Sequence, residues 1–321
     1  MQLYPGADLI ECEIGGRPLY LPVLSEGRVA MLVDCGTQQH AAHDVVEFFA
    51  DGRAAACEPR WLIITHPDGD HCGGLRAISE RFPNALTACG RLDQPLVECA
   101  DVLFSSRYDA YRADHGIFYN PETASFIRNC CGGPHPVTLT FAGGETIRLG
   151  EGRIIEIWHL PGHSHGHLGI FDQKYRALFY GDAIQGGGYQ SLKGEWVLCP
   201  TYLYVNAYLA TIAKIEQSSA ELIVGCHWPI CDGKEQIKEF CSASRDFVLQ
   251  TDRLVNSYLR QHTSGVSLQE LCESLGSTLG RWPTSANLEF AFAISGHLQR
   301  GIDAGTITVN RSLHPILYYV S

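Results

Sequence analysis

The sequence predicts an α/β fold over residues 1–233 and a small, mainly helical domain over residues 234–321. Short apolar runs of strand composition alternate with segments of helical periodicity in the first part, which is typical of a layered domain with a largely buried sheet. Several of these runs end in histidine or aspartate. From Lys234 onward the apolar residues follow helical spacing. These three observations set the expected architecture.

Composition and net charge limit the kinds of protein and partner that fit this sequence. The 321 residues are 45% hydrophobic and 18% charged, which fits a compact protein of one large or two medium domains. We find no apolar run of about 18 residues and no signal peptide at Met1–Ile10, so we expect a cytoplasmic protein whose 13 cysteines are reduced thiols. A formal charge of −11 disfavours a polyanionic partner. We therefore expect a small-molecule substrate, with nucleic acid unfavoured and no membrane partner.

The first elements follow one another at short intervals. A β-hairpin is expected around the turn at Ser25–Arg28, and a proline at position 83 stops a later helix. The elements, in order, are the hairpin strands Leu19–Leu24 and Val29–Val33, the helix Ala42–Ala50, the strand Trp61–Thr65, the helix Leu75–Phe82 and the strand Ala85–Ala88.

Asp34 follows the second hairpin strand directly and precedes Gly36 by two positions. Aspartate commonly forms turns, and a buried carboxylate at a strand end can instead orient a histidine that binds a metal. The sequence leaves both interpretations open.

The densest motif follows the strand Trp61–Thr65. Within six positions the chain offers four side chains of metal-ligand type: His66, Asp68, Asp70 and His71. A buried strand is a rigid support, and side chains at its exit can point into a cleft. Imidazole together with carboxylate suits zinc, iron or manganese. The alternative is an ordinary polar turn, which four such residues at this spacing make improbable.

Residues 100–135 interrupt the alternation with six aromatic side chains among polar residues. Such an insertion is either a lid over a substrate pocket or a cluster packed on the domain, and we favour the lid. The aromatic residues are Phe104, Tyr108, Tyr111, Phe118, Tyr119 and Phe126.

Three more strand ends deliver residues of ligand type. The strands Val137–Phe141 and Glu145–Leu149 precede Arg153–Trp158, which leads to His163, His165 and His167. A metal needs few of these histidines, so one or two should be structural or face the substrate. The hairpin Leu168–Phe171 and Ala177–Tyr180 ends in Asp182, and Glu221–Gly225 ends in Cys226 and His227. Cys72 and Cys226 are expected to point away from the site.

This series resembles the metallo-β-lactamase superfamily over roughly residues 15–233. The matching blocks are H-x-D-x-D-H at 66–71, Pro161-Gly162-His163, Gly181-Asp182 and His227. The resemblance implies an αββα sandwich with a dinuclear metal site at one edge of the two sheets. It assigns His66, Asp68 and His163 to the first metal position and Asp70, His71 and His227 to the second. Asp182 would bridge the two.

Asp68 departs from the pattern of the family, in which most members carry histidine at this position. A carboxylate adds negative charge and shifts preference toward iron or manganese without excluding zinc. We expect two divalent metal ions, zinc first, with iron or manganese as the alternative. Asp68 is also short, which would leave one position weak.

The region 234–321 reads as three helices and two short strands. The expected elements are the helices Lys234–Gln261, Ser267–Leu275 and Ser285–Gly301 and the strands Thr306–Val309 and Ile316–Val320, with Ser267 as an N-cap. They resemble the winged-helix-like domain of some members of the superfamily. From Phe240 onward the sequence contains six arginines and six acidic residues, so their formal charges cancel. It has no basic stripe that could bind phosphates. We interpret the domain as a packing, dimerisation or pocket-wall module, with a homodimer possible.

The leading hypothesis is a metal-dependent hydrolase of a small carbonyl substrate: an ester, lactone, thioester or amide. Asp70 would serve both as ligand and as the catalytic residue that orients the attacking hydroxide. Tyr202, Tyr204 and Tyr208 fit a partly apolar pocket. The alternatives are a phosphodiesterase or ribonuclease, weakened by charge, and an iron-dependent redox enzyme, motivated by Asp68.

Overall fold

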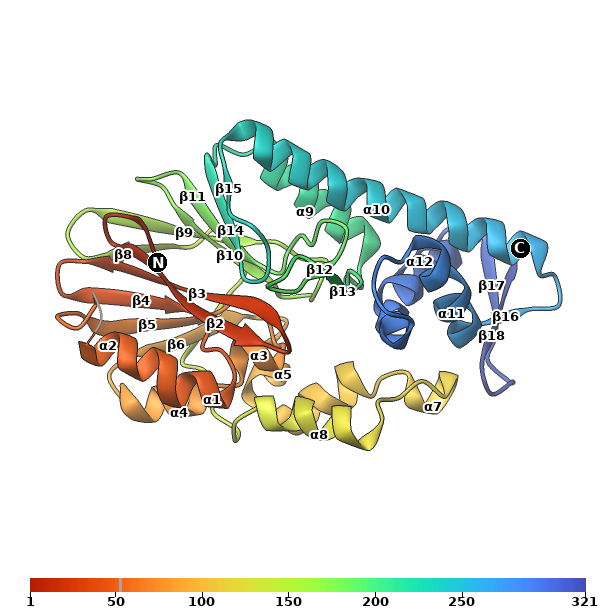
Figure 1. Cartoon of the computed structure of the whole chain (residues 1–321), viewed down its shortest axis with the longest axis horizontal. Helices are drawn as coiled ribbons and strands as arrows, with labels where there is room; N and C mark the ends of the chain where they lie inside the picture. Colours follow the sequence, from red (N-terminus) through yellow and green to blue (C-terminus); the bar gives the residue numbers. More distant parts are fainter. Residues whose placement is uncertain (52–53) are drawn as a thin grey trace.

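Two β-sheets pack face to face between layers of helices, and a smaller helical region lies at one end (Figure 1). The computed structural model describes residues 1–51 and 54–321. The N-terminus lies on the sandwich and the C-terminus at the far end of the helical region (Figure 1).

The first sheet has seven strands in chain order. Its neighbours are antiparallel from β1 to β4 and parallel from β4 to β7. The strands are β1 (Gln2–Tyr4), β2 (Ala7–Ile14), β3 (Arg17–Glu26), β4 (Val29–Val33), β5 (Glu58–Ile64), β6 (Leu86–Gly90) and β7 (Leu139–Phe141). The hairpin β3–β4 is therefore confirmed, but it does not open the chain. The strand β2 precedes it and pairs with β3 along its whole length.

The second sheet has the order β15-β14-β11-β10-β9-β8, with only the pair β11–β14 parallel among its described strands. The strands are β8 (Thr146–Leu149), β9 (Arg153–His159), β10 (Leu168–Asp172), β11 (Ala177–Gly181), β14 (Leu222–Gly225) and β15 (Cys231–Asp232). A separate ribbon joins β12 (Tyr189–Gln190) to β13 (Trp196–Leu198).

The core between the sheets draws on both of them. Leu9, Met31 and Ile63 of the first sheet and Ile170 and Phe179 of the second are at most 1% exposed and belong to one cluster. Alternate strand residues point to opposite faces, so the remaining apolar residues of each sheet face a helical layer. The arrangement is the αββα sandwich that the resemblance implied.

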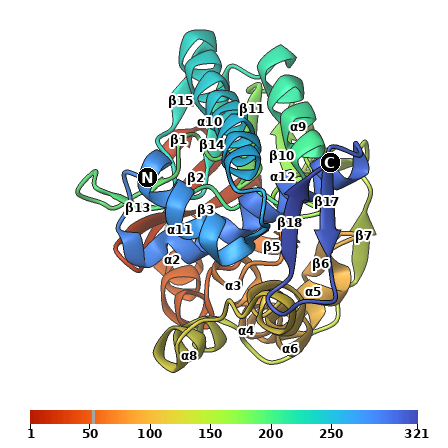
Figure 2. The same cartoon turned by 90° about the vertical axis from the view of Figure 1, so that its right-hand side faces the viewer.

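Helices cover the outer face of each sheet. On the first sheet lie α1 (Gln38–His40), a π-helical turn (Ala41–Val45), α2 (Val46–Asp51), α3 (Gly69–Cys72) and α4 (Leu75–Arg81). On the second lie α9 (Val205–Gln217) and α10 (Lys234–Gln261). Figure 2 shows α9 and α10 side by side, on the opposite side of the molecule from α4 and α8.

The insertion is helical. The helix α5 (Gln94–Glu98) precedes it, and it comprises α6 (Ala100–Leu103), a π-helical turn (Phe104–Tyr108), α7 (Arg112–His115) and α8 (Pro121–Cys130). Asn120 accepts the backbone N–H of Thr123 and so caps α8. A cap and a proline at the first helical position are both standard start signals.

The C-terminal elements pack against α10. Beyond this helix lie α11 (Leu268–Leu279), a 3₁₀ helix (Thr284–Phe290), α12 (Ala291–Asp303) and a sheet of β16 (Val266–Ser267), β18 (Leu317–Val320) and β17 (Ile307–Asn310). Ser267 caps α11 as expected by accepting the N–H of Glu270 at 3.2 Å. The expected third helix is split, because its first residues form a 3₁₀ helix. No helix among residues 1–51 and 54–321 is long and apolar enough to cross a membrane.

Candidate metal centre

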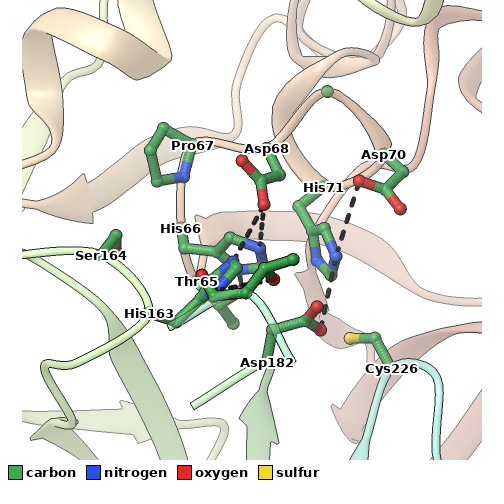
Figure 3. Close-up of polar contacts among 12 residues, drawn as sticks. Thr65, His66, Pro67, Asp68, Asp70, His71, His163, Ser164, Asp182 and Cys226 are labelled. Atoms are coloured by element: carbon green, nitrogen blue, oxygen red, sulfur yellow. Dashed lines mark hydrogen bonds and ion pairs between the residues drawn. The ribbon is translucent and has the colours of Figure 1, made fainter. Parts of the chain in front are cut away.

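Four strand ends bring seven side chains of ligand type to one edge of the sandwich. The segment after β5 supplies His66 and Asp68, and the short helix α3 supplies Asp70 and His71. The loop after β9 supplies His163, the end of β11 is followed by Asp182, and the end of β14 by His227. All seven residues singled out from the sequence meet here. Figure 3 labels His66, Asp68, Asp70, His71, His163 and Asp182, which surround one centre.

A first group forms around Asp68. Its Oδ2 lies 2.9 Å from Nε2 of His163 and 3.6 Å from Nε2 of His66. In Figure 3 Asp68 points down toward the two imidazoles. These three donor atoms lie close enough together to hold one ion.

A second group forms around His227. Its Nε2 lies 3.3 Å from Nε2 of His71 and 3.3 Å from Oδ2 of Asp70. Asp182 reaches this group with both oxygens, at 3.6 Å from His71 and 3.8 Å from His227. Asp182 also clusters with His66, so its carboxylate stands between the two groups.

Each of the four histidines is held through Nδ1, which leaves Nε2 for the centre. The Nδ1 partners are Thr65 Oγ1 for His66 (3.0 Å), Asp34 for His71 (2.9 Å), the Thr201 carbonyl for His163 (3.2 Å) and the Pro18 carbonyl for His227 (2.7 Å). Such contacts fix both the tautomer and the ring orientation of a metal-binding histidine.

The donor set fits a divalent cation. Nε2 of His66 and Oδ1 of Asp182 are buried and have no hydrogen-bond partner within the described ranges. A buried polar atom without a partner costs free energy, and a metal ion would satisfy both atoms. Four imidazole nitrogens and three carboxylates suit zinc, manganese or iron.

The electrostatics show how tightly the groups are coupled. Burial and, to a smaller extent, the neighbouring His71 together lower the pKa of His66 to about 4. Burial alone would raise the pKa of Asp70, but His71 and His227 hold it below its ordinary value. Neutral His66 and ionised Asp70 are the forms that bind a metal.

Asp34 is a buried support of this centre. One of its oxygens lies 2.9 Å from Nδ1 of His71, and the other accepts the backbone N–H of Thr65 at 2.7 Å. Of the two interpretations of Asp34, the structure favours the orienting carboxylate. Cys226 Sγ lies 3.6 Å from Asp34, behind His71, and Cys72 Sγ faces the Pro67 carbonyl at 3.3 Å.

Arg107 of the insertion was not predicted from the sequence. Its guanidinium pairs with both oxygens of Asp68, and its Nη2 lies 3.0 Å from Nε2 of His163. Tyr108 adds a hydroxyl that donates to Asp68 at 3.1 Å. No local motif marks Arg107. The available clue was the unusual carboxylate at position 68, whose extra charge requires a partner once it is buried.

A cavity of about 260 Å³ opens over the centre. The insertion lines it with Tyr108, Tyr119 and Phe126, and so forms a wall of the pocket. The C-terminal region contributes Glu289 and Phe292.

The three tyrosines near α9 play a different part from the one expected. None of them lines the cavity. Tyr202 and Tyr208 are buried and stacked with ring centroids 4.5 Å apart, and Tyr204 stacks on His165 at 3.7 Å. The tyrosines that reach the centre are instead Tyr108, described above, and Tyr189, whose hydroxyl donates to Asp182 at 3.0 Å. His167 is structural, because its Nε2 accepts the backbone N–H of Asp182.

Comparison with known proteins identifies the family. Residues 23–227 match the metallo-β-lactamase superfamily. The chain belongs to this superfamily. The expected αββα fold is thereby confirmed.

Two relatives show what proteins of similar sequence do. The chain is 25% identical over 162 residues to acyl-coenzyme A thioesterase MBLAC2 of Gallus gallus, covering 49% of this chain and 54% of the relative. It is 25% identical over 179 residues to hydroxyacylglutathione hydrolase of a Synechococcus strain, covering 52% and 54%. The chain thus spans about half the length of these relatives.

Two solved structures share the fold over nearly the whole chain. A β-lactamase domain protein from Burkholderia ambifaria superimposes with a TM-score of 0.77 at 15% identity, covering 100% of this chain and 94% of that one. A metallo-β-lactamase family protein from Thermus thermophilus gives 0.71 at 16% identity, covering 99% of both. At 15–16% identity these comparisons show the fold alone. Because they cover nearly the whole chain, the shared fold includes the C-terminal helices.

Proposed function

We propose that the protein is a metal-dependent hydrolase of a small carbonyl substrate and that thioesters are its preferred class. The observation that carries this proposal is the convergence of four Nε2 atoms and three carboxylates beneath one cavity. The first position would comprise His66, Asp68 and His163, and the second Asp70, His71 and His227. Asp182 would bridge them.

Divalent ions bound here would supply hydroxide near neutral pH and polarise the carbonyl oxygen of the substrate. Asp70 lines the cavity, so it would orient the nucleophile and take up its proton. Tyr189 would hold Asp182 in place through the hydrogen bond of 3.0 Å that its hydroxyl donates. The apolar wall formed by Phe126 and Phe292 would exclude water from the acyl group.

The names of the relatives favour thioesters within the carbonyl class. Both relatives are named for acyl groups carried by thiol compounds, coenzyme A in one and glutathione in the other. The lining supports an acyl chain, because most of its residues outside the centre are apolar or aromatic. These residues include Ile14, Tyr119, Phe126, Ile127, Leu198 and Phe292.

A phosphodiesterase or ribonuclease is the second candidate, supported by the superfamily and by the resemblance of the C-terminal region to a winged-helix-like domain. Beyond Arg107, which Asp68 engages, the lining carries the cation Arg17 and the carboxylate Glu289. Burial raises the pKa of Glu289. This balance does not favour a phosphodiester anion directly over the centre.

A substrate panel tests the proposal. We would assay acyl-coenzyme A thioesters, acylglutathione, p-nitrophenyl esters, lactones and bis(p-nitrophenyl) phosphate, with Asp70→Asn as the inactive control. We expect the highest kcat/KM on a thioester and a loss of at least about 100-fold in Asp70→Asn. Hydrolysis of the phosphodiester alone would overturn the proposal in favour of the second candidate.

A further inference from the structure

The guanidinium of Arg107 lies among the ligands of the first metal position. Arg107 is 6% exposed and comes from the π-helical turn of the insertion. Its Nη2 lies 3.0 Å from Oδ2 of Asp68 and 3.0 Å from Nε2 of His163. These are two of the three donor atoms that this position offers to a metal.

The guanidinium is held there from several sides. Its Nη1 donates to the backbone carbonyl of His163 at 3.2 Å, and its Cζ lies 5.4 Å from the ring centroid of Phe292. The insertion supplies the arginine, the loop after β9 supplies the carbonyl, and the C-terminal helix α12 supplies the ring. The contact between Arg107 and Asp68 is therefore built into the fold rather than made by a loose surface side chain.

Formal charge distinguishes the two positions. At the first position the carboxylate of Asp68 is matched by Arg107, so these two residues sum to zero. At the second position Asp70 contributes a negative charge that no lysine or arginine of the described ranges contacts as an ion pair. Asp182 stands between the positions and serves both. The second position is therefore more negative by about one unit of charge.

Two physical effects weaken metal binding at the first position. A cation beside the donor atoms repels a divalent ion, and the repulsion is strong where water is excluded. A carboxylate that accepts two guanidinium N–H groups also has less lone-pair density to give to a metal. Within the described residues Asp70 has no hydrogen bond or ion pair to a guanidinium, and Arg17 acts on its carboxylate only at longer range.

We propose that Arg107 makes the two metal positions unequal, so that Asp70, His71, His227 and Asp182 bind one divalent ion tightly while the first position binds a second ion weakly. At scarce metal the chain then holds one ion, and the guanidinium occupies the ligands of the other position. This proposal concerns the metal positions within the proposed hydrolase, but it is tested without any substrate.

The test is a titration of metal-free protein with Zn²⁺ against a chromophoric chelator. We expect two steps in the wild type whose dissociation constants differ by at least about tenfold. Asp68→Ala should keep the tight step and lose the weak one, whereas Asp70→Ala should lose the tight step. Arg107→Met, which has similar length and no charge, should tighten the weak step by about tenfold or more. Arg107→Lys, which keeps the charge, should not.

Three results would overturn the proposal. Two steps of equal affinity in the wild type would show that Arg107 does not separate the positions. Loss of the tight step in Asp68→Ala would place the tight site at the first position. A looser weak step in Arg107→Met would mean that the arginine holds Asp68 in place as a ligand. If Arg107→Met does not fold by circular dichroism, the Asp68→Ala and Asp70→Ala pair still decides which position is the tight one, and Arg107→Gln replaces Arg107→Met as the uncharged variant.

Discussion

At the scale of single residues, the centre depends on side chains that would never touch a substrate. Asp34 has a left-handed backbone, with φ of 61°, and this unusual conformation turns its carboxylate toward His71 and Thr65. Left-handed backbone is costly for most residues and least so for asparagine and aspartate. Both the backbone conformation and the hydrogen bonds therefore favour aspartate at position 34.

Replacing this carboxylate should weaken metal binding without altering the ligands themselves. We expect Asp34→Ala to raise the Zn²⁺ dissociation constant of the tight step by about 10- to 100-fold, because His71 loses the group that orients it. Asp34→Asn keeps the tolerance for left-handed backbone and an oxygen for the Thr65 N–H, so it should lose less. Equal affinities of Asp34→Ala and wild type in the same chelator titration would show that His71 needs no such support.

Asp182 is the residue on which both positions depend. Its two oxygens approach His71 and His227, and it also clusters with His66. We expect Asp182→Ala to reduce the metal content measured by mass spectrometry to well below one ion per chain and to abolish hydrolysis. Asp232→Ala, an exposed carboxylate in β15, is the matched control and should retain both. Unchanged stoichiometry in Asp182→Ala would mean that it bridges nothing.

At the scale of elements, α12 is tied to the catalytic part by a buried histidine. His297 is 2% exposed, and its two ring nitrogens lie 2.9 Å from the Tyr202 hydroxyl and 3.0 Å from the Asp252 carboxylate. Tyr202 precedes α9 and Asp252 belongs to α10. The contacts therefore join α12 to α10 and to the loop that precedes α9.

This histidine should make stability depend on pH. Burial lowers the pKa of His297 below its ordinary value, although Asp252 opposes the shift. The unfolded chain then binds a proton before the folded chain does as the pH falls below about 6.5, so the stabilisation is present above that pH and is lost below it. The loss is at most about 1.4 kcal/mol per pH unit.

Denaturant unfolding at pH 7.5 and pH 5.5 would measure the effect. We expect the free energy of unfolding to fall less between these two values in His297→Gln than in the wild type. The same comparison for His43→Gln, on the exposed side of the π-helical turn before α2, controls for histidines in general. Parallel decreases in wild type and His297→Gln would show that His297 does not contribute.

At the scale of the whole molecule, features formed by neighbouring residues in the sequence could be predicted. Contacts between residues far apart in the sequence could not. The strand ends carrying His66, His163 and His227 could be located because a strand, a turn and a ligand follow one another directly. Arg107 lies 39 positions from Asp68 in the chain, and only the folded insertion brings the two together. The strand β2 was also missed, although Glu11, Cys12, Glu13 and Ile14 alternate in polarity.

The expectation that Tyr202, Tyr204 and Tyr208 line the pocket was wrong for the same reason. Tyr202 and Tyr208 are close in sequence to the last ligand strand, but their side chains pack into the core below α12 and α9. The actual lining combines the insertion, the ribbon β12–β13 and the 3₁₀ helix before α12. Sequence periodicity reports which face of an element is buried, and it does not report which other element covers that face.

The core itself indicates how the two predicted domains behave on unfolding. One continuous cluster of buried residues contains Leu178 and Ile223 of the second sheet together with Leu271 and Phe290 of the C-terminal region. Because apolar burial is shared across this boundary, neither part keeps a complete core without the other. We therefore expect residues 234–321 to unfold together with the sandwich in one cooperative transition.

Hydrogen exchange followed by mass spectrometry in increasing denaturant would check this expectation. Peptides from β11 and from α11 should lose protection at the same denaturant midpoint in the metal-loaded protein. Leu271→Ala, which truncates a fully buried side chain in α11, should destabilise by about 2 to 5 kcal/mol and lower both midpoints equally. If the α11 peptides alone shifted, the C-terminal helices would be an independent domain resting on the sandwich, and their share of the cavity wall could open without unfolding the metal centre.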